Sequence, residues 1–295
     1  MLGIVTPVKN EEKNLLRTFN MLVKQTYPPR VWVIVDDNST DNTPNIIKKL
    51  EKEYDFIIGL SMYTKSSYDE VSRYGLVVHK GFKYILTTYK NINFLGILDA
   101  DILLKKDYFA VLMNNFSKYP KLGIASGRYL ITKNNHVYPA NMKIIPAAMI
   151  FRKECLLSIG GFPVSPMPDI IALLKAVNRG WLIGVSCSTY AIHLREHTSF
   201  NRYIKRGIGL YRVGYHPLNA LLGGFYLSMK NLSLQPMGLT IGYIKGVLHY
   251  SRIIDEEVRK YYYGSFYRRI YSIFRKIFRS KSTNIDFIES LIIEL

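Results

Sequence analysis

Residues 94–101 read Phe-Leu-Gly-Ile-Leu-Asp-Ala-Asp, an apolar run that ends in two carboxylates one residue apart. The run at 94–98 is typical of a buried strand. Residues i and i+2 of a strand point to the same face, so Asp99 and Asp101 would share one face where this strand ends. Two such carboxylates can hold one hard divalent cation, which can also bind phosphate oxygens. Many surface loops carry the same pattern, so its interpretation depends on the rest of the chain.

Apolar strands alternate with amphipathic helices around this segment. We expect strands at residues 2–6, 31–35, 57–62, 94–98, 122–126 and 181–186. We expect a helix capped by Asn10, one opening at Thr43-Pro44, and others over residues 70–89, 107–119 and from Asp169 onward. This alternation predicts an α/β fold with a mostly parallel sheet and helices on both of its faces.

Polar residues follow several of the predicted strands. Thr6, Asp37 and the Asp99/Asp101 pair each stand where an apolar strand ends. Ligands of open α/β sheets bind beyond the carboxyl ends of the strands. The sequence therefore predicts that these residues meet at one edge of the sheet.

Four motifs, in this order, resemble those of family 2 glycosyltransferases, which have the Rossmann-like GT-A fold. They are Ile-Val-Thr-Pro-Val-Lys-Asn-Glu-Glu at 4–12, Val-Ile-Val-Asp-Asp-Asn-Ser-Thr-Asp at 33–41, Ser-Arg-Tyr-Gly at 72–75 and Asp-Ala-Asp at 99–101. The similarity covers residues 2–215. It implies an enzyme that uses a nucleotide-diphosphate sugar as donor.

The resemblance also implies a set of nucleotide-sugar-binding residues: Thr6, Pro7, Glu11, Asp37, Arg73, Asp99 and Ala100. In it, Glu11 and Asp37 contact the nucleobase and its ribose, and Arg73 approaches the base or the diphosphate. The alternatives are that Asp36 and Asp41 only shape their turn, and that Arg73 is a surface helix charge.

A divalent metal, Mn²⁺ or Mg²⁺, is implied at the two aspartates. Asp101 would ligate it, and Asp99 would contact both the ribose and the metal. The metal would bridge the donor phosphates and stabilise charge on the leaving nucleoside diphosphate. The family often adds a histidine after its last strand, which His193 matches best, with His197 as competitor. Arg195 is a further candidate for the diphosphate.

The residue implied as catalytic base is Asp169. The family usually has Glu-Asp at the start of a helix here, whereas this chain has Pro168-Asp169. A carboxylate at this place would accept the proton of an acceptor hydroxyl as that oxygen attacks the anomeric carbon, and a single displacement inverts the configuration. The alternative is that Asp169 only stabilises the positive end of the helix.

The last third of the chain is basic and partly apolar. Residues 201–215 suggest a mobile basic loop over the donor phosphates. The apolar stretches 218–229 and 237–248 are too short to span a bilayer, and would pack as a helical hairpin or lie in the membrane interface. Residues 264–283 form a predicted basic amphipathic helix, which favours an anionic membrane surface or, alternatively, covers the protein or a partner. We therefore expect a catalytic domain at 1–215 and a helical region at 216–295.

Composition favours an anionic partner. Forty Lys and Arg against 22 Asp and Glu give a net charge of +18, and nucleic acid is disfavoured because no known reader motif is present. Cys155 and Cys187 suit a reducing compartment, and Met1–Pro7 enters a strand without a signal-peptide pattern.

The sequence thus predicts an inverting, metal-dependent glycosyltransferase, peripheral on the cytoplasmic face of the cell membrane. Its acceptor would be lipid-linked, such as a polyprenyl phosphate or a lipid-linked glycan. The alternatives are a soluble or protein acceptor, and a non-catalytic membrane or nucleic-acid binding protein on a degenerate scaffold, for which Pro168 is the supporting feature.

Overall fold

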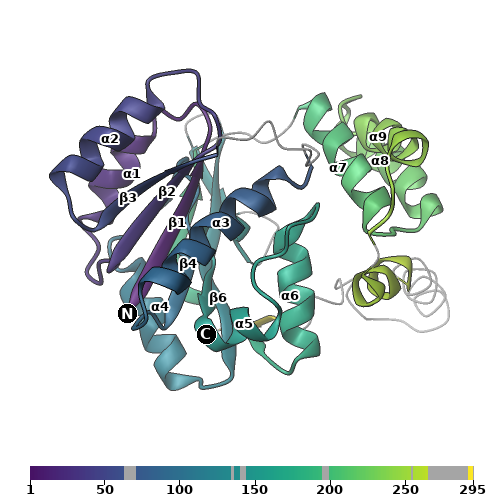
Figure 1. The fold of residues 1–295 in the computed structure, drawn as a ribbon. Helices are drawn as coiled ribbons and strands as arrows, with labels where there is room; N and C mark the ends of the chain where they lie inside the picture. The colour runs from purple at the N-terminus through teal and green to yellow at the C-terminus, as the bar shows by residue number, and fades with distance from the viewer. Residues whose placement is uncertain are drawn as a thin grey trace.

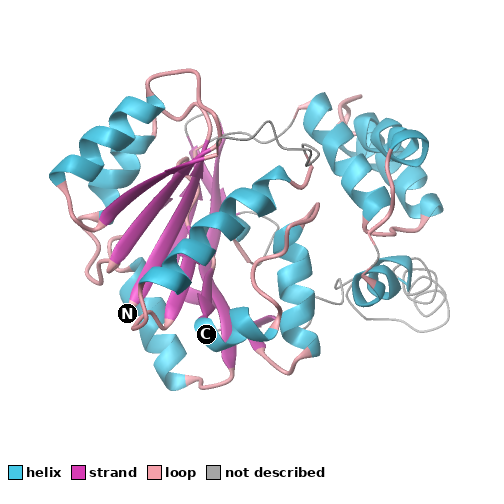
Figure 2. Cartoon of the chain, in the orientation of Figure 1, coloured by secondary structure: helices cyan, strands magenta, loops and turns pink. Residues whose placement is uncertain are grey.

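The computed structural model describes residues 1–62, 71–133, 136–139, 144–194, 199–253, 255–264 and 292–294. These residues form a twisted central sheet with helices on both faces, and a cluster of helices beside it (Figure 1). Figure 2 shows that the strands gather in one part of the molecule, while the cluster beside it is helical.

The sheet has the strand order β10-β9-β6-β8-β4-β1-β2-β3. Its members are β1 (Leu2–Val8), β2 (Val31–Asp36), β3 (Ile57–Ser61), β4 (Phe94–Ile97), β6 (Leu122–Lys133), β8 (Ile150–Arg152), β9 (Leu182–His193) and β10 (Ile292–Glu294). Strands β3, β2, β1 and β4 are parallel, as are β6, β9 and β10, and β8 runs antiparallel between the two groups. Short β5 (Ile102–Leu104) and β7 (His136–Pro139) pair antiparallel with β9 and β6. The predicted mostly parallel α/β sheet is confirmed.

Helices pack on both faces because alternate residues of each strand point to opposite sides. The helices are α1 (Leu15–Leu22), α2 (Thr43–Glu53), α3 (Arg73–Thr88), α4 (Tyr108–Lys118), α5 (Lys153–Ser158), α6 (Pro168–Asn178), α7 (Phe200–Arg212), α8 (Pro217–Asn231) and α9 (Met237–His249), with a 3₁₀ turn at Pro146–Ala148 and a further helix at 256–264. On β1, Val5 joins the core cluster that contains Phe82 of α3, whereas Ile4 joins the cluster that contains Leu15 of α1 and Phe109 of α4.

Two local predictions about the first half are wrong. Asn10 does not cap a helix: its φ is 58°, its side-chain oxygen accepts a hydrogen bond from the Thr40 amide, and α1 begins only at Leu15. Strand β4 ends at Ile97, so Asp99 and Asp101 lie in the turn after it, closed by a bond from the Ile102 amide to the Asp99 carbonyl. A turn, not the pleat of a strand, therefore orients the two carboxylates.

The predicted mobile loop at 201–215 is also wrong, because most of it is the helix α7. Ser199 caps this helix by accepting a hydrogen bond from the Arg202 amide. Its glycines are contact residues: a Cβ at Gly207 would overlap the Leu239 carbonyl oxygen of α9, and one at Gly209 would press on Pro166. Glycine permits such close approach of two backbones, which a sequence pattern does not distinguish from flexibility.

Helices α8 and α9 form the predicted hairpin, and α9 packs along α7 (Figure 1). Among the helices that the structure describes, none has the length and apolar character needed to cross a membrane. The predicted basic amphipathic helix at 264–283 lies outside the described residues, apart from its first residue.

We expect Gly242→Ala to lower the free energy of unfolding by about 1–3 kcal/mol, the usual cost of overpacking. A Cβ at Gly242 would overlap the backbone carbonyl of Ile204, which a side-chain movement cannot relieve. The matched control is Gly223→Ala in α8, where a Cβ meets nothing within 4 Å. This control should stabilise by about 0.5–1 kcal/mol through helix propensity. Thermal melts of both variants measure the difference, and equal melting midpoints would contradict the close packing.

Candidate active site

The carboxyl ends of β1, β2 and β4 meet at one edge of the sheet. Val8 stands opposite Asp36, and Val5 opposite Ile97, so the loops that follow these strands are neighbours. Pro7 lies there, half-buried, as do Asp37 and the turn at 99–101. Thr6 is fully buried, and its hydroxyl accepts a hydrogen bond from the Trp32 indole at 2.8 Å. The side chain of Thr6 thus belongs to the core behind this edge.

At one end of the edge, Arg73 is paired with Asp37. The Arg73 Nε donates to Asp37 Oδ1 at 2.7 Å, and a second guanidinium nitrogen contacts the same oxygen. Lys9 Nζ lies 3.9 Å from the other carboxylate oxygen. The Arg73 side chain is only 18% exposed, so it is not a free charge on the helix surface. The surface-charge alternative for Arg73 is therefore wrong, and its pairing with Asp37 was not predicted.

Asp36 and Asp41 hold the neighbouring loops in shape. Asp36 accepts hydrogen bonds from the amide and hydroxyl of Ser39. Asp41 accepts from the amide of Thr43 at 2.9 Å and from that of Glu12 at 3.1 Å, which ties the loop after β2 to the loop after β1. Both aspartates therefore have the turn-shaping role expected as the alternative.

Four carboxylates gather at the centre of the edge. Tyr74, at the start of α3, donates to Asp99 Oδ1 at 3.0 Å. Burial is the main cause that raises the pKa of Asp99 to about 7, and the charges of Asp101, Glu11 and Asp169 add to it, while the Tyr74 hydrogen bond opposes it. Carboxylates that disfavour each other's ionisation form a place where a cation is stabilised.

His193, the last residue of β9, connects this cluster to the neighbouring strands. Its Nε2 lies 3.2 Å from Asp101 Oδ2, and the Tyr129 hydroxyl of β6 lies 2.8 Å from its Nδ1. Both Asp101 and His193 are buried, at 7% and 6% exposure. Tyr129 holds the ring in place, a support that metal-ligating histidines usually have.

Asp101 and His193 fit a divalent ion in residue type and spacing. Neighbouring ligands of an octahedral ion at about 2.1 Å stand about 3 Å apart, close to the 3.2 Å between the two atoms here. Within the described part of the chain, no group of three or more His, Cys, Asp or Glu side chains is arranged to hold a metal.

Asp169 lies in the first turn of α6, where Pro168 is the first helical residue. Proline suits that position because its missing N–H would have no partner there. The carboxylate accepts hydrogen bonds from its own amide and that of Ile170, which lower its pKa, as does the charge of Arg206, but burial is larger and raises the pKa overall. The replacement of the usual glutamate by Pro168 therefore leaves Asp169 at the helix start.

Two residues of this cluster, Tyr74 and Tyr129, were given no role by the sequence reasoning. Tyr74 follows Arg73 directly, and its neighbour Gly75 packs so closely on the Pro163 carbonyl that a Cβ would overlap it. That contact holds the start of α3 against the loop that leads to Asp169. Arg206 was expected in a loop over the donor phosphates, whereas it lies on the helix α7, and its charge lowers the pKa of Asp169.

The remaining candidate residues are Ala100, Arg195 and His197. Ala100 is buried at 4% exposure, and its carbonyl accepts the Thr18 hydroxyl of α1 at 2.8 Å, so it anchors the turn. Arg195 and its neighbour His197 lie outside the described residues.

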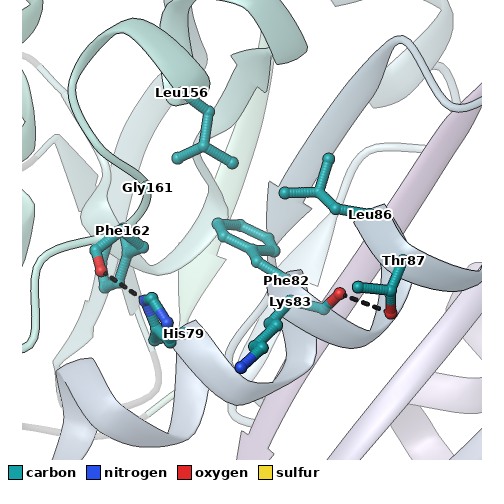
Figure 3. A pocket seen from close by; sticks show the side chains of 8 residues that line it. All are labelled: His79, Phe82, Lys83, Leu86, Thr87, Leu156, Gly161 and Phe162. Atoms are coloured by element: carbon teal, nitrogen blue, oxygen red, sulfur yellow. Dashed lines mark hydrogen bonds between the residues drawn. The ribbon is translucent and has the colours of Figure 1, made fainter.

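A small cavity of about 140 Å³ lies elsewhere, between α3 and the segment 156–162 (Figure 3). Its walls are mostly apolar, with Phe82, Leu86, Leu156 and Phe162 among them. His79 Nδ1, 3.1 Å from the Phe162 carbonyl oxygen, fixes the loop at its rim. No carboxylate lines this cavity, so the carboxylate cluster at the sheet edge is the candidate active site.

Comparison with known proteins agrees with this geometry. The family model described as glycosyl transferase family 2 matches residues 3–197. The chain is 27% identical over 168 residues to a poly-beta-1,6-N-acetyl-D-glucosamine synthase of Staphylococcus epidermidis, covering 56% of this chain and 37% of that protein. It is 24% identical over 213 residues to the Staphylococcus aureus (strain COL) synthase, covering 71% and 46%. The chain thus spans less than half the length of these curated relatives.

Solved structures share the fold at low sequence identity. The mannosyltransferase PcManGT from Pyrobaculum calidifontis, in complex with GDP-Man and Mn²⁺, matches with a TM-score of 0.59 at 15% identity, covering 83% of this chain and 86% of that one. TarS 1-349 from S. aureus, in complex with UDP, matches with a TM-score of 0.51 at 17% identity, covering 71% and 65%. These matches confirm the GT-A fold.

Proposed function

The chain belongs to glycosyl transferase family 2, and we propose that it transfers a sugar from a nucleotide-diphosphate donor to an acceptor with inversion at the anomeric carbon. One observation carries this proposal: the turn that holds Asp99 and Asp101 and the first turn of α6, which holds Asp169, come close to each other, beside His193 and Arg206. A base, a set of metal ligands and a cation for phosphate are the groups that such a transfer needs.

Asp169 is the proposed base. One of its carboxylate oxygens takes the proton of the acceptor hydroxyl while the acceptor oxygen bonds to the anomeric carbon and the bond to the diphosphate breaks. The nucleoside diphosphate leaves with that electron pair, and attack opposite to it inverts the configuration. With a phosphate acceptor, the same position needs no proton transfer. The two amides that bond to Asp169 fix its direction.

Asp101 and His193 would hold a divalent metal, with Asp99 beside them. Such a metal supplies charge that stabilises the leaving diphosphate. The Mn²⁺ bound by the neighbour PcManGT supports this assignment, as does the spacing of Asp101 and His193. The charge of Arg206 on α7 acts on Asp169 and lowers its pKa, and a guanidinium near this place could pair with phosphate oxygens.

Pro7, Glu11, Asp37 and Arg73 form the proposed nucleoside end of the site. Arg73 is already held by Asp37, so the two side chains present a fixed pattern of donors and acceptors to a base. The structural neighbours carry UDP in one case and GDP-Man in another, and both nucleotides are therefore included in the test below.

We further propose a lipid-linked acceptor and a position on the cytoplasmic face of the cell membrane. The positive charge of +18 supports an anionic surface as partner. A soluble or protein acceptor is the alternative. The non-catalytic scaffold, which rested on Pro168, loses its support because Pro168 suits the first position of α6 and leaves Asp169 in place.

A donor screen tests the function. We expect the purified protein with Mn²⁺ to release nucleoside diphosphate from one donor of a panel of UDP-, GDP- and other nucleotide sugars, with lipid extract supplied as acceptor. Excess EDTA should abolish release, and added Mn²⁺ should restore it, because the chelator removes the ion that stabilises the leaving diphosphate. Release that persists undiminished in EDTA would contradict the metal assignment, and no release from any donor would contradict the function.

A further inference from the structure

The hairpin of α8 and α9 carries an apolar face that faces away from the protein. On α8 the exposed apolar residues recur at helical spacing: Leu218, Leu221, Leu222, Phe225, Tyr226 and Met229. Four of these, from Leu222 onward, are 58–64% exposed. In the turn between the helices, Leu232 and Leu234 are 95% and 80% exposed. Large apolar side chains gathered in this way mark a contact surface.

This face is not the one that holds the hairpin to the protein. On α9, Gly238, Gly242 and Gly246 lie against α7, whereas Ile241, Ile244, Val247 and Leu248 are 46–70% exposed. On α8, Gly224 is the residue that lies against α9, near Thr240. Helix α7 lies between the sheet and the α8–α9 hairpin (Figure 1). The apolar side chains therefore point outward.

The charged residues of the segment that carries this face have one sign. Residues 197–254 contain no Asp or Glu, and they contain these basic residues: Arg202, Lys205, Arg206, Arg212, Lys230, Lys245 and Arg252. Lys230, Lys245 and Arg252 are exposed on or beside the hairpin. An apolar stripe on a segment that carries exposed cations and no carboxylates complements an anionic lipid surface, whose headgroups attract the cations while the interface takes up the apolar residues.

We propose that the α8–α9 hairpin docks this protein onto an anionic lipid bilayer, with Leu222, Phe225, Leu232 and Leu234 in the interface. The hairpin helices are too short to cross a bilayer but long enough to lie in its surface. A second copy of the chain fits less well, because a symmetric contact through this face would bring the exposed lysines toward each other. The inference deepens the proposed membrane position, and its test does not depend on glycosyl transfer.

Vesicle sedimentation of the full chain tests the proposal. We expect binding to vesicles of phosphatidylcholine with phosphatidylglycerol, and weaker binding to phosphatidylcholine alone. The double variant Leu222→Glu, Phe225→Glu should bind the anionic vesicles at least about tenfold more weakly. The reason is that two apolar side chains are replaced by carboxylates, which have the same charge sign as the vesicle surface. The matched control is Leu157→Glu, a similarly exposed leucine on α5, which should bind as the original protein does.

A second variant reports the position of the hairpin directly. The chain's tryptophans, Trp32 and Trp181, both lie in the catalytic half. Phe225→Trp should add emission that shifts to shorter wavelength with anionic vesicles and is quenched by brominated lipid, since the indole would enter the interface. Circular dichroism and nucleotide binding verify that each variant is folded.

The outcomes separate the possible partners. Loss of vesicle binding of threefold or more in the double variant, together with quenching in Phe225→Trp, supports the proposal. A smaller loss, absent quenching, or no vesicle binding by the original protein overturns it. A dimer in light scattering that the double variant converts to monomer, without vesicle binding, would instead assign the face to a second copy.

Discussion

Replacing Asp169 by Asn should lower the turnover number by about 10²–10⁴-fold, the usual contribution of a general base. The amide has nearly the same shape as the carboxylate, so the start of α6 should keep its structure, but it cannot accept the proton of an acceptor hydroxyl. Nucleoside diphosphate affinity should change by less than about threefold, because the effect lies in the transition state alone. Single-turnover transfer and calorimetric titration with the nucleotide measure the two quantities.

The pH profile adds a second check of the same residue. Burial raises the pKa of Asp169 above its ordinary value, and only the ionised carboxylate can act as base. Turnover should therefore fall as the pH decreases through this raised pKa, at a higher pH than for an ordinary aspartate. The remaining activity of Asp169→Asn should lack this acid limb.

Asp55→Asn is the matched control, since it makes the same change at an exposed carboxylate in the turn before β3. It should turn over like the original protein. Substantial transfer by Asp169→Asn would leave Asp169 with only its stabilising role at the helix start, and the base would have to be sought elsewhere.

Replacing Asp101 by Ala should abolish the stimulation of nucleoside diphosphate release by Mn²⁺. The change removes the carboxylate that stands 3.2 Å from His193 Nε2, and the loss of this oxygen ligand weakens the site for a divalent ion that prefers oxygen. We expect a loss of release of about 10²-fold or more, in the range seen when an electrostatic group of an active site is removed. Manganese binding, followed by electron paramagnetic resonance with the nucleotide present, should weaken in parallel.

The control for this change is Asp107→Asn, six residues further along. Asp107 bonds to Thr189 and pairs with Lys105, away from His193. Its variant should keep metal-stimulated release. If Asp101→Ala bound Mn²⁺ as tightly as the original protein, the metal site would have to lie elsewhere, and His193 would be a structural partner of Tyr129 only.

The sequence was sufficient for the sheet and its edge because apolar strands and the polar residues after them are local patterns. We expected Asp37, Asp99 and Asp101 to lie close together because parallel strands have their carboxyl ends at the same edge. The strands that precede these residues are indeed parallel. The predicted ends of the strands and helices were less accurate. Strand β9 extends to His193, beyond the predicted end at 186, because its pairing with β5 and β6 depends on distant residues.

The helix α7 shows why other features of the structure were not predicted from the sequence. Gly207 and Gly209 made residues 201–215 resemble a mobile loop, whereas their lack of a side chain serves contacts with Leu239 and Pro166. Such contacts join segments that are distant in sequence, and propensity is a weak guide where tertiary packing decides. Tyr74 and Tyr129 were missed for a related reason: only the folded chain brings their hydroxyls to Asp99 and His193.

The close packing of α7 against α9 couples movements of the α8–α9 hairpin to the candidate active site. Through Gly207 and Gly242 the two backbones leave no space for sliding, and α7 is tied to the start of α3 by a hydrogen bond from Arg212 to Ser72. A displacement of the hairpin would therefore be transmitted to Arg206. By thermodynamic reciprocity, if attachment of the hairpin changes donor affinity by some factor, donor binding must change the strength of attachment by the same factor.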